Sequence, residues 1–194
     1  MKDYLAELKA AVEVCHKFGV KVADGALHPE GLYWFTYQDY LKRGLKDSAK
    51  YISSFLAKPA QALLQNPDAA KSDARYSYFD RVSTLLFGYK DIDLDYVNVH
   101  FYYPKSFGNN RQADMKPMID FYRRVTGKPV ISNEWSTFDT DTVMLLHAMR
   151  EAKRSGLKYA IFFSEDGKNS TPLTDDNSNL SGLGAVYRRY FKEK

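Results

Sequence analysis

The stretch that decides the fold is Lys128-Pro-Val-Ile-Ser-Asn-Glu-Trp135. A turn-forming Gly127-Lys-Pro entry precedes a short Val-Ile core, and Glu134 stands where the apolar run stops. Folds of alternating strands and helices present catalytic groups in this way, at the C-terminal ends of parallel strands. An ionised side chain there needs a partner or a substrate. The alternative is an Asn-Glu turn after an edge strand, and the other strand ends decide between the two.

Length and composition indicate one globular domain over residues 1–194. At 22.3 kDa the chain is large enough to bury a substantial core. Its formal net charge of +4 is too small and too scattered to predict nucleic-acid binding. No apolar run approaches membrane-spanning length, and no signal peptide is visible. One cysteine (Cys15) excludes an internal disulfide, and together with four histidines it gives no zinc spacing.

Apolar periodicity predicts helices alternating with strands along most of the chain. The segment 28–93 is the exception, because it contains no convincing strand and its prolines divide it into several helices. We interpret this segment as a helical insertion. The predicted strands are 20–27, 94–104, 128–134 and 157–164. The predicted helices are 1–18, 37–45, 48–56, 74–87, 111–125, 140–155 and 180–192.

Strands that alternate with helices indicate an α/β fold with a parallel sheet and right-handed crossovers. A complete (β/α)8 barrel, or TIM barrel, typically needs about 250 residues and rarely fewer than about 200. This chain has 194 residues, and the helical insertion uses a large share of them. The sequence therefore predicts a partial TIM barrel of about four parallel strands that lacks the N-terminal half. A small open α/β sheet is the alternative.

Polar side chains stand at the C-terminal end of each predicted strand. The strand ends carry Asp24, then His100 and Tyr102, then Asn133-Glu-Trp135, and finally Ser164-Glu-Asp166. Because parallel strands bring these ends to one edge of the sheet, we expect the side chains to converge. A single polar strand end is usually a solvated turn, whereas four in register favour a functional site.

The residues of these strands resemble the C-terminal half of a clan A glycoside hydrolase. This is the large retaining (β/α)8 group that includes many cellulases, mannanases and xylosidases. Val97-Asn-Val-His-Phe-Tyr102 resembles the sixth strand of that family, and Gly127–Trp135 resembles the seventh. Tyr159-Ala-Ile-Phe-Phe-Ser164 resembles the eighth strand, and the tail from 172 to 191 resembles the closing loop and helix. Residues 20–27 then match the fifth strand, while the resemblance is weak over 28–93.

The resemblance implies a role for each residue at these strand ends. Glu134 is the expected nucleophile, which attacks the anomeric carbon in retaining hydrolysis. Tyr102 is expected to donate a hydrogen bond to that carboxylate, and His100 to contact a sugar hydroxyl. The expected substrate-binding residues are His100, Tyr102, Asn133, Trp135 and Phe163.

The chain departs from the family pattern at two points. Phe163 stands in the region where the eighth strand of the family usually ends in a tryptophan. More seriously, the family's acid/base glutamate follows an asparagine on the fourth strand, and no strand of this chain matches it. Retaining hydrolysis uses both carboxyl groups, and losing general-acid assistance typically costs about 10²–10⁴-fold. We therefore expect a portion of a glycosidase that is inactive or weakly active alone.

The expected partners are a carbohydrate substrate and a complementary N-terminal half-barrel. The second partner would supply the acid/base group and cover the open strand edges, which otherwise invite aggregation. This chemistry requires no cofactor and no metal ion. Neither a nucleic acid nor a membrane is expected as a partner. An extracellular or periplasmic location fits the parent enzymes.

Two other functions are compatible with the sequence. A metal-dependent barrel enzyme could use Asp24, His100, Glu134 and Glu165 as mixed nitrogen and oxygen ligands, in which case chelation would abolish activity. A carbohydrate-binding remnant would keep an aromatic cleft without turnover.

Overall fold

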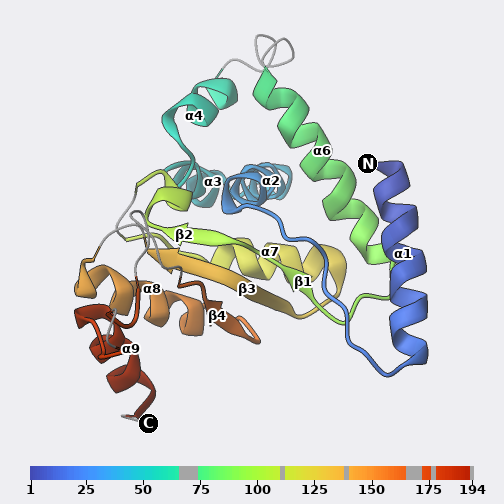
Figure 1. Cartoon of the computed structure of the whole chain (residues 1–194). Coiled ribbons are helices and arrows are strands. Elements are labelled where there is room, and N and C mark those ends of the chain that lie inside the picture. The colour runs from blue at the N-terminus through green and yellow to red at the C-terminus, as the bar shows by residue number, and fades with distance from the viewer. Residues whose placement is uncertain (66–73, 110–111, 138–139, 165–171, 176–177, 193–194) are drawn as a thin grey trace.

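The computed structural model describes residues 1–65, 74–109, 112–137, 140–164, 172–175 and 178–192. These residues form an α/β fold whose described strands make a four-stranded parallel sheet (Figure 1). The strands are β1 (Val97–Asn98), β2 (Phe101–Tyr103), β3 (Val130–Thr137) and β4 (Ala160–Phe162). The helices are α1 (Lys2–Lys17), α2 (Pro29–Lys42), α3 (Lys46–Ser53), α4 (Lys58–Gln65), α6 (Ala74–Gly88), α7 (Lys116–Thr126), α8 (Thr142–Arg154) and α9 (Gly182–Lys192), with short 3-10 turns η1 (Tyr89–Asp91) and η2 (Lys105–Phe107).

The sheet is centred on β3, the longest strand. β1 and β2 pair in parallel with successive parts of one side of β3, and β4 pairs in parallel with the other side. Beyond β1, the segment 23–27 adds two isolated parallel bridges, Ala23 to Tyr96 and Leu27 to Val99. The spatial order of the segments therefore follows their order in the chain.

Two of the predicted strands are interrupted. Residues 20–27 form bridges rather than a strand, and 94–104 divides into β1 and β2. The reason is that side chains replace main-chain carbonyls as acceptors in the hydrogen-bond ladder. Asn98 N donates to Asp24 Oδ1 at 2.5 Å, and Asn133 N donates to Asn98 Oδ1 at 3.1 Å. Such substitutions break the regular pattern of parallel pairing.

Local sequence signals account for the ends of the helices. α1 ends two residues before Gly19, and α7 ends directly before Gly127. Both glycines adopt positive φ angles, of 69° and 70°. The Asp141 carboxylate caps α8 by accepting from the main-chain N–H groups of its first turn. The helix predicted at 37–45 begins earlier, at Pro29, because His28 caps it and proline suits the first helical position.

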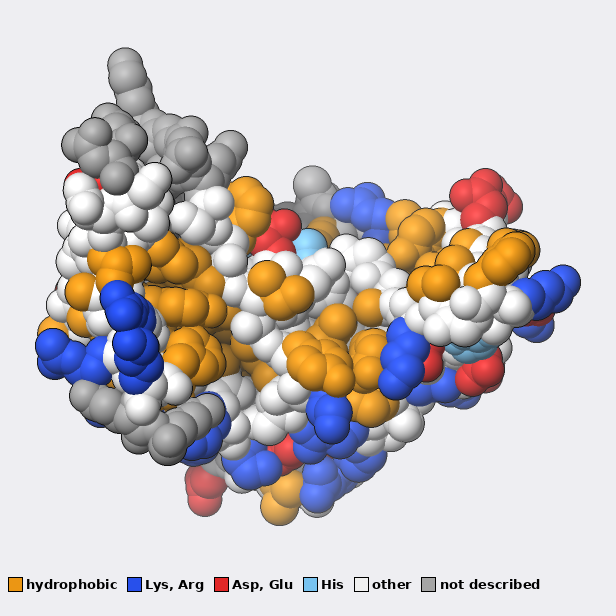
Figure 2. All heavy atoms as spheres, turned by 60° about the horizontal axis from the view of Figure 1, so that its bottom comes forward, with side chains coloured by type: hydrophobic (Ala, Val, Ile, Leu, Met, Phe, Trp, Pro, Cys, Tyr) orange, Lys and Arg blue, Asp and Glu red, His pale blue; other side chains and the backbone are white. Residues whose placement is uncertain are grey.

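Among the described residues, the helices leave part of one face of the sheet uncovered. In Figure 1, α7 lies behind the strands, and α8 and α9 lie on the β4 side. Phe162 packs against Trp135 and against Tyr187 of α9. Since strand side chains alternate, Ile161 points to the opposite face, where it is 59% exposed. From below, Figure 2 shows hydrophobic side chains gathered across the middle of the molecule, with many lysine and arginine side chains along the lower rim.

The described helices of segment 28–93 pack through aromatic side chains that belong to the main hydrophobic core. Trp34 of α2 is 5% exposed and stacks on Phe79 of α6 with ring centroids 4.1 Å apart. Tyr33 is fully buried and contacts Phe55 and Phe107, which joins the insertion to the end of β2. In the described ranges, no helix is long and apolar enough to cross a membrane.

Candidate functional site

The Glu134 carboxylate on β3 is the centre of a polar cluster. The Tyr102 hydroxyl donates a hydrogen bond to Glu134 Oε1, and His100 Nδ1 lies 3.8 Å from Oε2. The side chains of Glu134 and His100 are each 31% exposed, so solvent reaches the carboxylate while it keeps its partners. We refer to Asn98, His100, Tyr102, Asn133 and Glu134 as the Glu134 cluster.

The two asparagines of the cluster orient the histidine. Asn133 Oδ1 accepts hydrogen bonds from Asn98 Nδ2 and from His100 Nε2, each at 2.6 Å. An amide oxygen accepts only, so His100 carries a hydrogen on Nε2. The other ring nitrogen, Nδ1, then faces the Glu134 carboxylate. The cluster therefore combines a carboxylate, a phenol and an oriented imidazole on neighbouring strands. The prediction that Glu134 ends its strand is wrong, because β3 continues to Thr137 by pairing with β2.

A serine and a second histidine hold the main chain of Tyr102. Ser106 Oγ accepts from Tyr102 N at 2.9 Å and lies 3.0 Å from His28 Nε2. His28 Nδ1 accepts from Glu30 N, so the hydrogen lies on Nε2 and points to Ser106. Burial lowers the pKa of His28, which favours the neutral ring. This pair is consequently a structural support and not a serine nucleophile with its base.

Asp24 lies beneath the cluster. Its side chain is buried, with Oδ1 accepting from Asn98 N and Oδ2 accepting from Ala26 N at 3.0 Å. The Tyr122 hydroxyl lies 3.4 Å from Oδ2. Burial raises the pKa of Asp24 to about 7, although hydrogen bonds from Asn98 N and Ala26 N oppose this shift. The structure thus connects Asp24 to the cluster through the main chain of Asn98.

The aromatic residues expected to bind sugar differ in their surroundings. Trp135 is 2% exposed between Phe101 and Phe162, and its indole N–H has no hydrogen-bond partner among the described residues. Its ring is part of the core and is not presented to a ligand. Phe163 is 41% exposed, and its N–H donates to the carbonyl of Trp135 at 2.7 Å. Phe163 therefore remains available as a binding surface beside β3.

Three of the proposed metal ligands, Asp24, His100 and Glu134, are among the described residues, and of these His100 and Glu134 face each other. No set of three or more His, Cys, Asp or Glu side chains is arranged to hold a metal ion within the ranges that the structure describes. Both oxygens of Asp24 already accept main-chain hydrogen bonds. Glu165 and Asp166 lie outside the described residues. The described geometry therefore gives the metal hypothesis no specific support.

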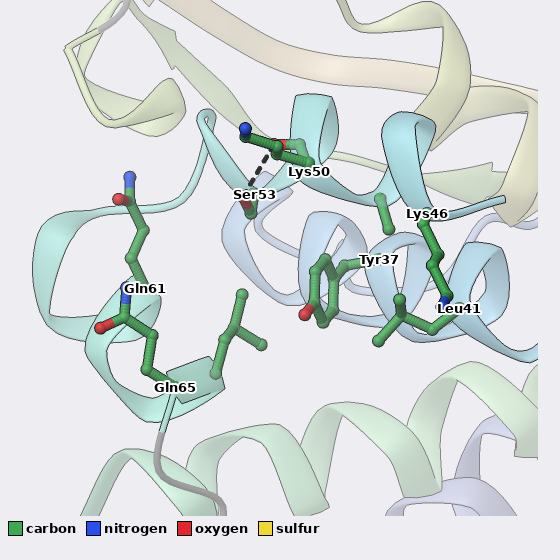
Figure 3. Close-up of a pocket in the computed structure, with 9 residues that line it drawn as sticks. Tyr37, Leu41, Lys46, Lys50, Ser53, Gln61 and Gln65 are labelled. Atoms are coloured by element: carbon green, nitrogen blue, oxygen red, sulfur yellow. Dashed lines mark hydrogen bonds between the residues drawn. The ribbon is translucent and has the colours of Figure 1, made fainter.

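A separate hollow of about 230 Å³ lies among α2, α3 and α4 (Figure 3). Figure 3 shows Tyr37 and the long side chains of Lys46, Lys50 and Gln61 around it. The Ser53 hydroxyl there donates to the carbonyl of Lys50 at 2.8 Å. The lysine and glutamine ends at its rim are typical of a solvated groove between helices. We therefore place the candidate site at the Glu134 cluster and not in this hollow.

Sequence reasoning missed Asn98 and Ser106 as members or supports of the site. Asn98 has a detectable signal, because Asn98, His100 and Tyr102 alternate along one strand and share a face. Ser106 lies beyond the proline that ends β2, and its contact with Tyr102 N depends on the following turn. That contact has no periodic signature in the sequence.

Comparison of the chain with protein-family models, curated proteins and solved structures finds no match.

Proposed function

We propose that this chain is the nucleophile-bearing portion of a retaining glycoside hydrolase with a partial TIM-barrel fold, and that Glu134 is the nucleophile. One observation carries the proposal. The Glu134 carboxylate is part-exposed on the central parallel strand and accepts a hydrogen bond from Tyr102. Retaining hydrolysis needs a carboxylate that can reach the anomeric carbon and is held in one orientation.

The other members of the Glu134 cluster suit the binding of a sugar. His100 and Asn133 offer polar atoms beside the carboxylate, and Phe163 offers an exposed ring one strand away. Carbohydrates combine hydroxyl groups with apolar ring faces, so polar and aromatic side chains together fit them. Trp135 has no part in this proposal, because its ring is buried.

The acid/base group is assigned to a complementary half-barrel. The resemblance puts that group on a strand before the four matched here. The open sheet supports the need for a cover, because parallel sheets are normally buried on both faces. Here Tyr159 and Ile161 are 51% and 59% exposed. We therefore expect weak or no hydrolysis by the chain alone, and hydrolysis when a half-barrel with an Asn-Glu strand end is added.

The test compares hydrolysis and glycan binding for the wild type and Glu134→Gln, each with and without the added half. The proposal predicts release of product by the complemented wild type and none by the complemented variant. Glycan binding by both proteins without any turnover would contradict it and favour the carbohydrate-binding remnant. Loss of activity on chelation would instead favour a metal enzyme.

A further inference from the structure

The buried carboxylate of Asp24 occupies a position in the sheet that a main-chain carbonyl normally fills. The flanking ladder bonds are regular, with Leu27 N donating to the Asn98 carbonyl and His100 N donating to the Leu27 carbonyl. Asn98 N precedes both of these bonds along the strand, and it donates instead to Asp24 Oδ1 at 2.5 Å. Asp24 Oδ2 also accepts from Ala26 N, where the backbone has a positive φ of 75° that non-glycine residues rarely adopt. One carboxylate thus joins a strained turn to β1.

The side chain of Asn98 repeats this substitution one strand further on. Asn133 N donates to Asn98 Oδ1 at 3.1 Å, while Asn98 Nδ2 donates to Asn133 Oδ1 at 2.6 Å. The same Asn133 oxygen accepts from His100, which faces Glu134. A continuous series of contacts therefore runs from the buried carboxylate of Asp24, across two strands, to the part-exposed carboxylate of Glu134.

We propose that Asp24 is a positioning residue, which acts through the main chain and amide of Asn98 to hold Asn133 and His100 in place beside Glu134. This inference rests on the function proposed for Glu134, but the arrangement itself exists without substrate. Asp24 lies too deep to touch a ligand, with 4% of its surface exposed. Its effect on the site is therefore indirect, through a defined path of hydrogen bonds.

The groups that face Asp24 come from three further elements. Tyr122 of α7 lies within hydrogen-bonding distance of Oδ2. Tyr89 of η1 interacts with Asp24 and with Tyr4 of α1, and the Tyr4 hydroxyl accepts from Gly25 N at 3.3 Å. These tyrosines surround the carboxylate with phenol groups and bring no positive charge to it. The main-chain N–H groups of Asn98 and Ala26 are accordingly its principal partners.

Asp95 provides a matched control. Its Oδ2 accepts from Val22 N at 2.8 Å, so it anchors the same 20–27 segment from the opposite end. It does so at the surface, in contact with His16, and outside the series that leads to Glu134. If the effect comes only from loosening segment 20–27, it should appear both in Asp24→Asn and in Asp95→Asn. If it comes from positioning the Glu134 cluster, it should appear in Asp24→Asn alone.

The experiment records the ring nitrogen resonances of His100 and the side-chain amide resonances of Asn98 and Asn133 in the substrate-free full chain. Asp24→Asn cannot accept at both oxygens, so one of its two main-chain hydrogen bonds is lost. We expect these resonances to shift in Asp24→Asn and to remain in place in Asp95→Asn. Unchanged resonances in folded Asp24→Asn, or equal shifts in both variants, would overturn the proposal.

A second variant keeps the proposal testable if Asp24→Asn does not fold. Asn98→Ala retains the main-chain N–H that Asp24 binds but removes the amide, so we expect the His100 and Asn133 resonances to shift while Asp24 stays bound. If Asn98→Ala keeps the wild-type His100 resonances, the proposed series of hydrogen bonds from Asp24 through Asn98 to His100 would also be refuted. These measurements contain no sugar, so they can support or refute the positioning role of Asp24 even if the glycosidase proposal fails. In the same way, the test of hydrolysis does not depend on the role of Asp24.

Discussion

The Tyr102 hydroxyl is the group that touches the Glu134 carboxylate directly, and the rest of the Glu134 cluster determines how the neighbouring imidazole is held. Tyr102 itself is fixed at its main-chain N–H by Ser106. A carboxylate that is held by a phenol on one oxygen presents its other oxygen in a limited range of directions. This is the property that a nucleophile in a displacement reaction requires.

Replacing Tyr102 with phenylalanine is predicted to slow the complemented enzyme. A hydrogen bond to a charged group contributes about 1.5–3 kcal/mol, which corresponds to a loss of roughly 10–150-fold in rate. The measurement is the rate of glycoside hydrolysis with the complementary half present. Tyr51→Phe, at a tyrosine of α3 that is 50% exposed, serves as control and should retain the wild-type rate. Equal rates for Tyr102→Phe and wild type would contradict the role of the phenol.

Asp24 is predicted to make stability depend on pH. Its pKa is about 7 in the folded chain and 3.8 at its ordinary value, so the folded state holds the proton more tightly. The contribution of Asp24 to the free energy of unfolding is fully present below pH 3.8 and is lost as the pH rises through about 7. The loss is at most on the order of 4 kcal/mol. Urea unfolding of the wild type and Asp24→Asn at pH 4.5 and 7.5 measures it. The stability of the wild type relative to Asp24→Asn should be lower at pH 7.5 than at pH 4.5. An equal difference at both pH values would contradict the raised pKa of Asp24.

At the scale of elements, the sequence predicted most of the helices and the central strand. β3 and α8 are marked by strong signals, namely an apolar run after a turn and an apolar stripe that stops near Gly156. The interruptions at 20–27 and between β1 and β2 were not predictable. They depend on two side chains, Asp24 and Asn98, entering a ladder that is formed by residues more than 30 positions away. Apolar periodicity carries no information about such a substitution.

The turn between α7 and β3 gives a prediction for one element. Gly127 has a φ of 70°, and a Cβ added there meets no atom within 4 Å, so Gly127→Ala tests backbone strain alone. We expect the free energy of unfolding to fall by about 1–2 kcal/mol. Gly182→Ala, at the ordinary φ of the first residue of α9, should leave stability unchanged or raise it by up to about 1 kcal/mol. Similar losses for both variants would show that φ is not the cause.

At the scale of the whole molecule, the feature that most needs an explanation is the part of the sheet that the described residues leave uncovered. β4 pairs with β3 on one side, and Tyr159, Ile161 and Phe163 expose 51%, 59% and 41% of their surfaces beside it. Exposed apolar edge strands tend to pair with other chains. A complementary half-barrel would cover both this edge and the face that carries the Glu134 cluster.

We therefore predict that the isolated chain associates as its concentration rises, and that Ile161→Lys reduces this association. A charge on an exposed strand discourages edge pairing, while substitutions at exposed sites change stability by only about 0.5 kcal/mol. Sedimentation or light scattering over a range of concentrations measures the effect. Val143→Lys, at an apolar residue of α8 that is 67% exposed, is the control and should associate like the wild type. Association that persists equally in Ile161→Lys would contradict the role of this edge.

The most direct test of the proposed function is covalent trapping of Glu134. The chain is incubated with fluorinated glucosides, mannosides and xylosides that form long-lived glycosyl-enzyme intermediates, with and without the complementary half-barrel, and the labelled peptide is identified by mass spectrometry. We predict one added glycosyl group on Glu134, seen only when the half-barrel is present and absent from Glu134→Gln. A label on another residue of the complemented protein, or labelling that survives Glu134→Gln, would contradict the proposal that Glu134 is the nucleophile.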